Sequence, residues 1–157
     1  MARRGRRSAT VARISLGRWR ISHLRRDGVV ELVAVGSCWH GGTGYWPGLG
    51  RHVANQRMIG IECQNDGGGS PGKPHRSSWP DAQYDALVKL NAAFCRRIDA
   101  DASHCLSHKE YDQGDPPTAE GKWDPGAIDM PTLRNRHPGA DQPQTDDDRR
   151  LPHGTHR

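Results

Sequence analysis

The sequence predicts an α/β domain in which helices pack on a mixed β-sheet. Two β-prone runs flank Asp27-Gly28, a short apolar run covers residues 57–64, and residues 80–98 repeat apolar side chains at helical spacing. A further β-prone segment follows at residues 104–111. The order β-β-β-α-β is typical of one α/β domain whose strands run in both directions.

The strands before the helix are indicated by short β-prone runs and by turn residues. TVARISL, residues 10–16, is the first such run. In the next segment, WRISHLRRDGVVELVAVG, glycine at position 28 tolerates the positive φ of a tight turn, which predicts a β-hairpin. RMIGIECQ, residues 57–64, is typical of a central strand, and the Gly-, Pro- and Ser-rich stretch after it indicates an exposed loop.

Residues 80–98 predict the main helix. Ser78 lies near the expected N-cap, and Pro80 and Asp81 fall in the first turn. Six apolar side chains then share one helical face, namely Tyr84, Leu87, Val88, Phe94, Cys95 and Ile98. The segment HCLSHKEY, residues 104–111, is expected to be a short strand that leads into a loop.

Charge and composition divide the chain into three parts. Residues 1–26 hold nine of the 23 basic residues and no acidic one, which leaves 14 basic against 18 acidic residues in the remainder. We expect a basic segment of uncertain structure over residues 1–19, a domain over 20–134, and a disordered tail over 135–157, which is polar and lacks periodicity. The basic segment is interpreted as solvated, with nucleic acid or an anionic cell surface as the alternative partner.

Composition also argues against export and membrane insertion. No apolar run approaches the ~20 residues of a membrane-spanning helix. The Arg-rich start is not followed by the apolar stretch of a secretory signal, so we expect the protein in the cytoplasm of the producing cell. The four cysteines form no C-x-x-C pair and are expected to be reduced, mostly buried thiols (Cys38, Cys63, Cys95 and Cys105).

The stretch SHKEYDQGDPPTAEGKWDPGAIDM, residues 107–130, is crowded with side chains that bind metals or handle protons. His108 stands at the end of an expected strand, and Asp124 follows a loop and directly precedes Pro125-Gly126. A catalytic zinc usually has three protein ligands drawn from His, Asp, Glu and Cys, with water in the fourth position. These two residues could supply two ligands, although a distant His and Asp are more often a surface pair.

Six segments together resemble the zinc-dependent N-acetylmuramoyl-L-alanine amidases. They are RDGVVELVAVG, CWHGG, NQRMIGIECQND, WPDAQYDAL, SHKE and KWDPGAIDM, in the order and spacing of that family. The family includes peptidoglycan recognition proteins and phage endolysins, and residues 20–134 look most like the amidase domain of endolysins from phages of actinobacteria. The resemblance implies an amidase-like fold, Zn²⁺ as cofactor, and a monomer that cleaves the bond between N-acetylmuramic acid and L-alanine. Bacterial peptidoglycan is the implied partner, reached after release from the producing cell.

The resemblance also implies roles for individual residues. His108 and Asp124 match two of the family's three zinc ligands. Glu62 matches the acid that orients or deprotonates the attacking water, and Lys122 matches the cation that stabilises the oxyanion. Positions that line the groove for glycan and peptide are matched by His23, His40 and Asn55. These residue types suit amide hydrolysis, because the water needs activation and the tetrahedral oxyanion needs neutralisation.

The family's third zinc ligand has no match in this chain. Relatives carry it on their first strand, in a His-His-Thr type motif upstream of the hairpin, whereas no His precedes His23 here. We therefore expect the family's first strand to be lost or replaced. His23 or His40 is the alternative third ligand.

Three other functions remain open from the sequence. A catalytically weak or inactive amidase-like module would bind peptidoglycan through its groove without holding zinc tightly. A nucleic-acid protein would use the Arg-rich start with His40 and Asn55, but the domain itself is net acidic, so no specific nucleic-acid partner is expected. A structural zinc site at Cys105 and His108 would need a second pair of ligands with matching spacing, which the sequence lacks.

Overall fold

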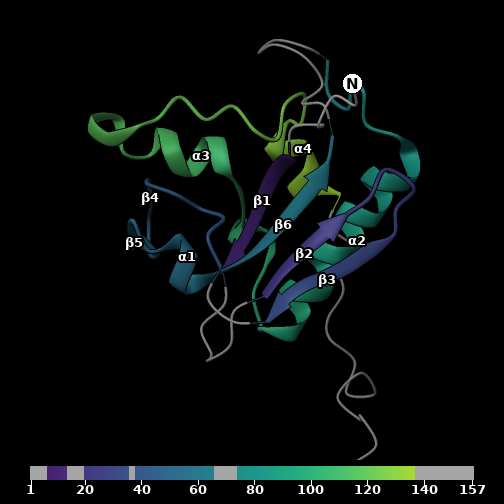
Figure 1. The fold of residues 1–157 in the computed structure, drawn as a ribbon, viewed down its shortest axis with the longest axis horizontal. Coiled ribbons are helices and arrows are strands. Elements are labelled where there is room, and N and C mark those ends of the chain that lie inside the picture. The colour runs from purple at the N-terminus through teal and green to yellow at the C-terminus, as the bar shows by residue number, and fades with distance from the viewer. Residues whose placement is uncertain (1–6, 14–19, 36–37, 66–73, 137–157) are drawn as a thin grey trace, which may run out of the picture.

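Among the described residues, five strands form the main sheet, in the spatial order β3-β2-β6-β1-β7 (Figure 1). The computed structural model describes residues 7–13, 20–35, 38–65 and 74–136. The strands are β1 (Arg7–Arg13), β2 (Arg20–Leu24), β3 (Val30–Val35), β6 (Met58–Gln64) and β7 (Cys105–Ser107). β2 runs parallel to β6, and the other neighbouring strands are antiparallel, so the sheet is mixed as predicted.

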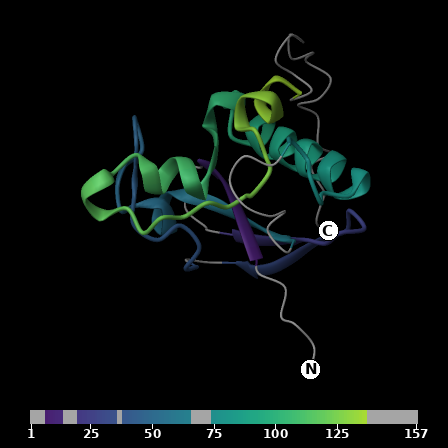
Figure 2. The same cartoon turned by 90° about the horizontal axis from the view of Figure 1, so that it is seen from above.

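Shorter elements surround this sheet. A two-stranded ribbon consists of β4 (Tyr45–Trp46) and β5 (Gly50–Arg51). The helices are α1 (Ala54–Arg57), α2 (Asp81–Arg97), α3 (His108–Gln113) and α4 (Met130–Asn135), with the 3₁₀ turns η1 (Ala102–His104) and η2 (Pro116–Thr118). Figures 1 and 2 show α2 along one face of the sheet, while α3 lies beside the β4–β5 ribbon.

The predicted hairpin is confirmed as β2 and β3. Its turn contains Gly28 at φ 85°, and a Cβ there would lie 2.7 Å from the carbonyl oxygen of Ala82. Glycine is therefore required both by the turn and by the close approach of α2. The predicted central strand is also confirmed, because β6 lies in the middle of the sheet between β2 and β1.

The predicted main helix is confirmed as α2, with a different start. Pro80, expected in the first turn, is the N-cap residue, and Ser78 lies near the N-cap as expected but makes no capping hydrogen bond. The Ser78 hydroxyl instead donates to Oδ1 of Asn65 at 3.3 Å. Gln83, fully buried in the first turns of α2, donates to the carbonyl oxygens of Gln64 at 2.8 Å and Leu24 at 3.3 Å, which ties the helix to β6 and β2.

Two apolar clusters hold the two sides of the sheet. The first joins α2 to β2, β6 and α4, and contains Leu24, Ile61, Cys63, Trp79, Tyr84, Leu87, Ile128, Met130 and Leu133. The second lies under α3 and the β4–β5 ribbon, and contains Leu49, Ala54, Met58, Leu106 and Tyr111. Side chains alternate along a strand, so Ile61 and Cys63 face α2 while Glu62 lies on the other face.

β1 lies between β6 and β7 in the sheet. It covers Arg7–Arg13, whereas the sequence predicts a strand over residues 10–16, of which 14–16 lie outside the described residues. The basic segment 1–19 therefore contributes a strand to the sheet. That strand reads RSATVAR and contains no His.

The sequence predicts one short strand over residues 104–111, but this segment divides into a strand and a helix. β7 ends at Ser107, and α3 starts at His108. The Ser107 side chain accepts from the backbone N–H of Glu110, and the Glu110 carboxylate accepts from the N–H of Ser107, which is a capping box. This reciprocal pair of hydrogen bonds ends the strand at Ser107 and begins the helix at His108.

The end of the described chain is helical. α4 runs to Asn135, one residue into the tail that is predicted to be disordered, and residues 137–157 of that tail lie outside the described part. Within the part of the chain that the structure describes, no helix is long and apolar enough to cross a membrane.

Candidate active site

His108 and Asp124 meet at the end of β7. The Nδ1 atom of His108 lies 3.2 Å from Oδ2 of Asp124. The backbone also joins them, because the N–H of Lys109 donates to the carbonyl oxygen of Asp124 at 2.9 Å. Two donors bound to one tetrahedral zinc at ~2.0–2.1 Å lie about 3.3 Å apart, so this spacing suits either a hydrogen bond or two ligands of one metal.

The far nitrogen of the His108 ring is available to a ligand. Its Nε2 atom is buried and has no hydrogen-bond partner within the described residues. If neutral His108 donates from Nδ1 to the carboxylate, its lone pair is on Nε2. A carboxylate that orients a histidine in this way is common behind metal-binding rings, because it fixes the tautomer and raises the basicity of the free nitrogen.

His40 places a second imidazole beside His108. Its Nδ1 lies 2.9 Å from the carbonyl oxygen of Cys38, and its Nε2 is buried without a partner among the residues described. The pKa of His40 lies below its ordinary value, mainly because the ring is buried and also because of the nearby charge of His108. A Cβ added at Gly42 would lie 3.5 Å from Nε2 of His108, so the segment that carries His40 lines the same space.

The backbone around His40 is held by Asn55 and Gly60. The side-chain oxygen of Asn55 accepts from the N–H groups of His40 and Gly41, both at 2.8 Å. Gly60 of β6 lies under the ring, since a Cβ there would come within 2.8 Å of its Cγ and Cδ2 atoms. Asn55 is buried and its side-chain oxygen accepts hydrogen bonds inside the protein, so this residue positions the backbone at His40.

The loop that carries Lys122 and Asp124 is organised by Asp112. This fully buried carboxylate of α3 accepts from the N–H of Glu120 at 2.7 Å and from the N–H of Lys122 at 2.9 Å. The Lys122 ammonium pairs with Glu120 at 2.9 Å, and its pKa is raised by that hydrogen bond and by the charges of Glu120, Asp124 and Asp112. Lys122 is therefore a cation held close to Asp124.

Lys109 closes the other side of this loop. Its ammonium group donates to the carbonyl oxygens of Ile128 at 2.7 Å and Pro125 at 3.4 Å. Burial lowers the pKa of Lys109, although nearby acids oppose that shift. Trp79 adds a hydrogen bond from its indole nitrogen to the carbonyl oxygen of Gly126 at 3.0 Å. Side-chain hydrogen bonds thus hold the backbone after Asp124 at the carbonyl groups of Pro125, Gly126 and Ile128.

Glu62 and His23 are paired in register on β6 and β2. Glu62 follows Gly60 by two positions, so both belong to the sheet face on which the His40 ring lies. His23 Nδ1 lies 2.8 Å from the carboxylate of Glu31 on β3. The structure therefore gives His23 a partner on the hairpin, whereas the Nε2 atoms of His40 and His108 have none within the described part.

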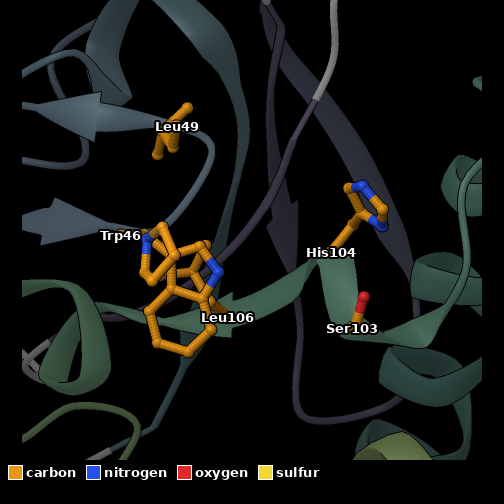
Figure 3. A pocket seen from close by; sticks show the side chains of 6 residues that line it. Trp46, Leu49, Ser103, His104 and Leu106 are labelled. Atoms are coloured by element: carbon orange, nitrogen blue, oxygen red, sulfur yellow. The ribbon is translucent and has the colours of Figure 1, made fainter.

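A small pocket lies elsewhere, between the β4–β5 ribbon and the start of β7. Figure 3 shows the Trp46 indole and Leu106 on one side, with His104 and Ser103 on the other. Neither His108 nor Asp124 lines it. Among the described ranges, no group of three His, Cys, Asp or Glu side chains is close enough to hold a metal ion, at this pocket or elsewhere.

A comparison with protein families decides the identity of this fold. The family model described as N-acetylmuramoyl-L-alanine amidase matches residues 9–127. The chain belongs to this amidase family. The match starts within β1 and ends after the loop of Lys122 and Asp124, so it includes every candidate site residue. No curated protein and no solved structure matches the chain.

Membership in the amidase family implies hydrolysis of N-acetylmuramoyl-L-alanine bonds in peptidoglycan. The family is typically zinc-dependent. The sequence motifs do not single out Asp112, which lies outside them, or Lys109, which lies within SHKE but is given no role by the resemblance. The Ser107–Glu110 capping box was detectable from the spacing S-x-x-E, which marks the start of a helix.

Proposed function

We propose that this amidase is zinc-dependent and acts as a phage endolysin on bacterial peptidoglycan. The observation that carries the zinc proposal is the His108–Asp124 pair, 3.2 Å apart, with the Nε2 atom of His108 buried and unpartnered within the described residues. A buried nitrogen lone pair without a partner is costly unless a ligand occupies the space in front of it. A metal ion satisfies that requirement.

His108 and Asp124 are the residues that would hold zinc, with Asp124 either as a ligand beside Nδ1 of His108 or as the group that orients the ring toward a metal at Nε2. Of the two alternative third ligands, His40 is supported better than His23, because its Nε2 is buried without a hydrogen-bond partner among the described residues and the following Gly42 approaches Nε2 of His108. The Nδ1 atom of His23 is paired with the carboxylate of Glu31. When bound, zinc supplies a Lewis acid that polarises the amide carbonyl and makes water acidic enough to lose a proton near neutral pH.

The protein's own groups would handle the proton and the developing charge. Glu62, on the sheet face shared with His40, takes the proton of the attacking water and passes it to the leaving amine of L-alanine. Lys122 brings a positive charge to the oxyanion after exchanging its contact with Glu120 for the substrate. His23, His40 and Asn55 line the groove, with Asn55 acting through its hold on His40 and Gly41.

The endolysin role is supported by the six segments that resemble amidase domains of endolysins from phages of actinobacteria. In this role the protein is a monomer that accumulates in the cytoplasm of the producing cell. It reaches the cell wall after release and cleaves peptidoglycan there.

A catalytically weak module that binds peptidoglycan is the second candidate. It is favoured by the number of ligands, since His108 and Asp124 form a pair and no group of three His, Cys, Asp or Glu side chains in the described ranges could hold a metal ion. Two ligands hold a metal less firmly than three, while the groove residues would still recognise a muropeptide.

A digestion of purified peptidoglycan tests the proposal. We expect added zinc to support the release of peptides with a new N-terminal L-alanine and no new reducing sugar ends, and a chelator to stop it. Glu62→Gln should lower that rate by about 10²–10⁴-fold, as expected for loss of a general base. Asp85→Asn, an exposed carboxylate on α2, serves as the control. Binding without cleavage supports the second candidate, and cleavage between sugars would contradict both.

A further inference from the structure

The thiol groups of Cys95 and Cys105 lie against each other in the interior. Cys95 is in the last turn of α2, and Cys105 is the first residue of β7. Their sulfur atoms are 3.5 Å apart, and the two residues are 0% and 1% exposed. The S–S bond of a disulfide is about 2.05 Å long, so a bridge needs the sulfurs to approach by about 1.5 Å.

The backbone holds both cysteines in this position. The carbonyl oxygen of Cys95 accepts from the N–H of Ala100 at 2.9 Å. The Sγ atom of Cys95 lies 3.4 Å from the carbonyl oxygen of Asp101. The carbonyl oxygen of Cys105 accepts from Nη1 of Arg134 on α4 at 2.8 Å. The turn between the two residues is therefore ordered at both ends, and the sulfurs face each other as a property of the fold.

We propose that Cys95 and Cys105 form a covalent modification site, a dithiol that a small-molecule disulfide oxidises to an intramolecular disulfide. One cysteine thiolate attacks the small disulfide, which gives a mixed disulfide and releases one small thiol. The second thiolate attacks the protein sulfur of that mixed disulfide and releases the other small thiol. The protein loses two protons and two electrons, and the reagent is reduced to two thiols.

The other cysteines differ from this pair. Cys63 packs in the apolar cluster under α2, and Cys38 lies partly exposed in the segment before His40. The contact with Cys95 and burial both raise the pKa of Cys105, so the native pair is protected from reagents in solution. Oxidation should accordingly be fast when the chain folds in the presence of the disulfide reagent and slow once it has folded reduced.

The bridge would join the end of α2 to the strand that presents His108. β7 contains only Cys105, Leu106 and Ser107, and α3 begins at the next residue. A protein made in a reducing cytoplasm would carry the two thiols, and a protein folded under oxidising conditions would carry the disulfide. This inference does not depend on the amidase being active or on zinc.

Refolding of the full chain in buffers of reduced and oxidised glutathione tests the site. We expect a monomer that is lighter by about 2 Da and has lost two of its four cysteine thiols. Trypsin should then release LNAAFCR (90–96) joined to IDADASHCLSHK (98–109), and a reductant should separate them. The unfolding equilibrium constant should fall roughly 100-fold on oxidation, as for a bridge that closes a short loop.

Matched variants separate this pair from the other thiols. Cys63→Ala, the control at a buried cysteine outside the pair, should still form the bridge, whereas Cys95→Ala and Cys105→Ala should gain no stability from oxidised glutathione. The peptide map of the wild-type protein decides the proposal even if a variant does not fold. Four remaining thiols in the refolded protein, or a linked peptide that contains Cys38 or Cys63, would overturn it.

Discussion

The Nδ1 atom of His108 and the Oδ2 atom of Asp124 lie 3.2 Å apart although 16 positions separate the residues in sequence. This single contact fits two arrangements of a metal site. Asp124 either binds the metal beside His108 or orients the ring so that Nε2 faces the metal. The arrangements differ in what removal of the carboxylate does, because loss of an orienting group typically costs 10–100-fold in affinity, whereas loss of one ligand of a weak site costs more.

Zinc affinity should depend most on His108. We expect His108→Ala to abolish measurable binding in equilibrium dialysis, because both arrangements use its ring. His40→Ala should weaken binding more than His23→Ala, since the His23 ring is paired with Glu31. His104→Ala, a histidine on η1 outside this cluster, is the control. Full zinc occupancy in the His23→Ala, His40→Ala double variant would show that neither ring is the third ligand.

A histidine placed on β1 should strengthen the metal site. Ala9 is in register with Glu62 on β6, and its neighbour Thr10 is in register with Ser107, the residue before His108. We therefore expect Ala9→His to raise zinc affinity at least tenfold, because it offers a third ligand from the first strand. Ser8→His is the matched control, since Ser8 is in register with Cys63, which packs toward α2. Equal gains from both variants in a zinc titration would contradict the register.

Local sequence signals were sufficient to predict the hairpin, β6 and α2. Each depends on contacts within a short segment or on a periodic apolar pattern: Gly28 at the turn, the apolar run before Glu62, and the spacing of Tyr84, Leu87 and Cys95. The pairing of His108 with Asp124 is different, because it depends on a loop that returns across 16 positions. The family motifs, and not periodicity, suggested that the two residues meet.

The parts that sequence reasoning missed depend on long-range or reciprocal contacts. The helix at His108 was expected to be a strand because β-prone residues precede it, and the capping box of Ser107 and Glu110 overrides that preference. Asp112 could not be singled out, since an acidic residue in a polar stretch is usually solvated, and only the folded chain buries it against two loop N–H groups. The position of the His40 ring likewise depends on Gly60, because a Cβ there would come within 2.8 Å of the ring.

Lys122 should matter for turnover more than for folding. Its ammonium pairs with Glu120 on a partly exposed loop, and exposed ion pairs contribute little to stability. Loss of a charge that stabilises the transition state costs about 10²–10³-fold in rate. We therefore expect Lys122→Met to lower kcat for peptidoglycan release by that factor with the unfolding midpoint unchanged. Lys89→Met, on the exposed face of α2, controls for the loss of one charge. An unchanged kcat would remove Lys122 from the mechanism.

Asp112 should set the position of the Lys122 loop. Replacement by Ala leaves the N–H groups of Glu120 and Lys122 without their acceptor. Glu120 is exposed and Lys122 is half-buried, so water can satisfy part of this loss, and Asp112→Ala should destabilise the protein by about 1–3 kcal/mol. Asp112→Asn retains one acceptor oxygen and should lose about half as much. Urea unfolding measures both values, and faster hydrogen exchange at the Lys122 amide should accompany the loss. Equal stability of Asp112→Ala and the wild type would contradict the assignment.

The stability contributed by Glu110 should disappear in acid. Its carboxylate accepts from Arg134 at 2.7 Å and from the N–H of Ser107 at 2.9 Å. Burial alone would raise the pKa of Glu110, but these hydrogen bonds and the charge of Arg134 lower it below its ordinary value of 4.5. A carboxylate whose pKa is lower in the folded state stabilises the protein above its unfolded pKa, and this contribution is lost as the pH falls through the folded pKa.

Glu110→Gln should therefore lower the free energy of unfolding by about 1–3 kcal/mol at pH 7, because the charge-assisted pair with Arg134 is lost while the Gln amide oxygen can still accept from the N–H of Ser107. The difference from the wild type should shrink as the pH falls below the ordinary value of 4.5, where the wild-type carboxylate becomes protonated. Urea unfolding of both proteins at several pH values measures this difference. Asp85→Asn, on the exposed face of α2, should show little difference at any pH. A Glu110→Gln deficit that stayed constant from pH 7 into acid would mean that shape, and not charge, makes Glu110 stabilising at the start of α3.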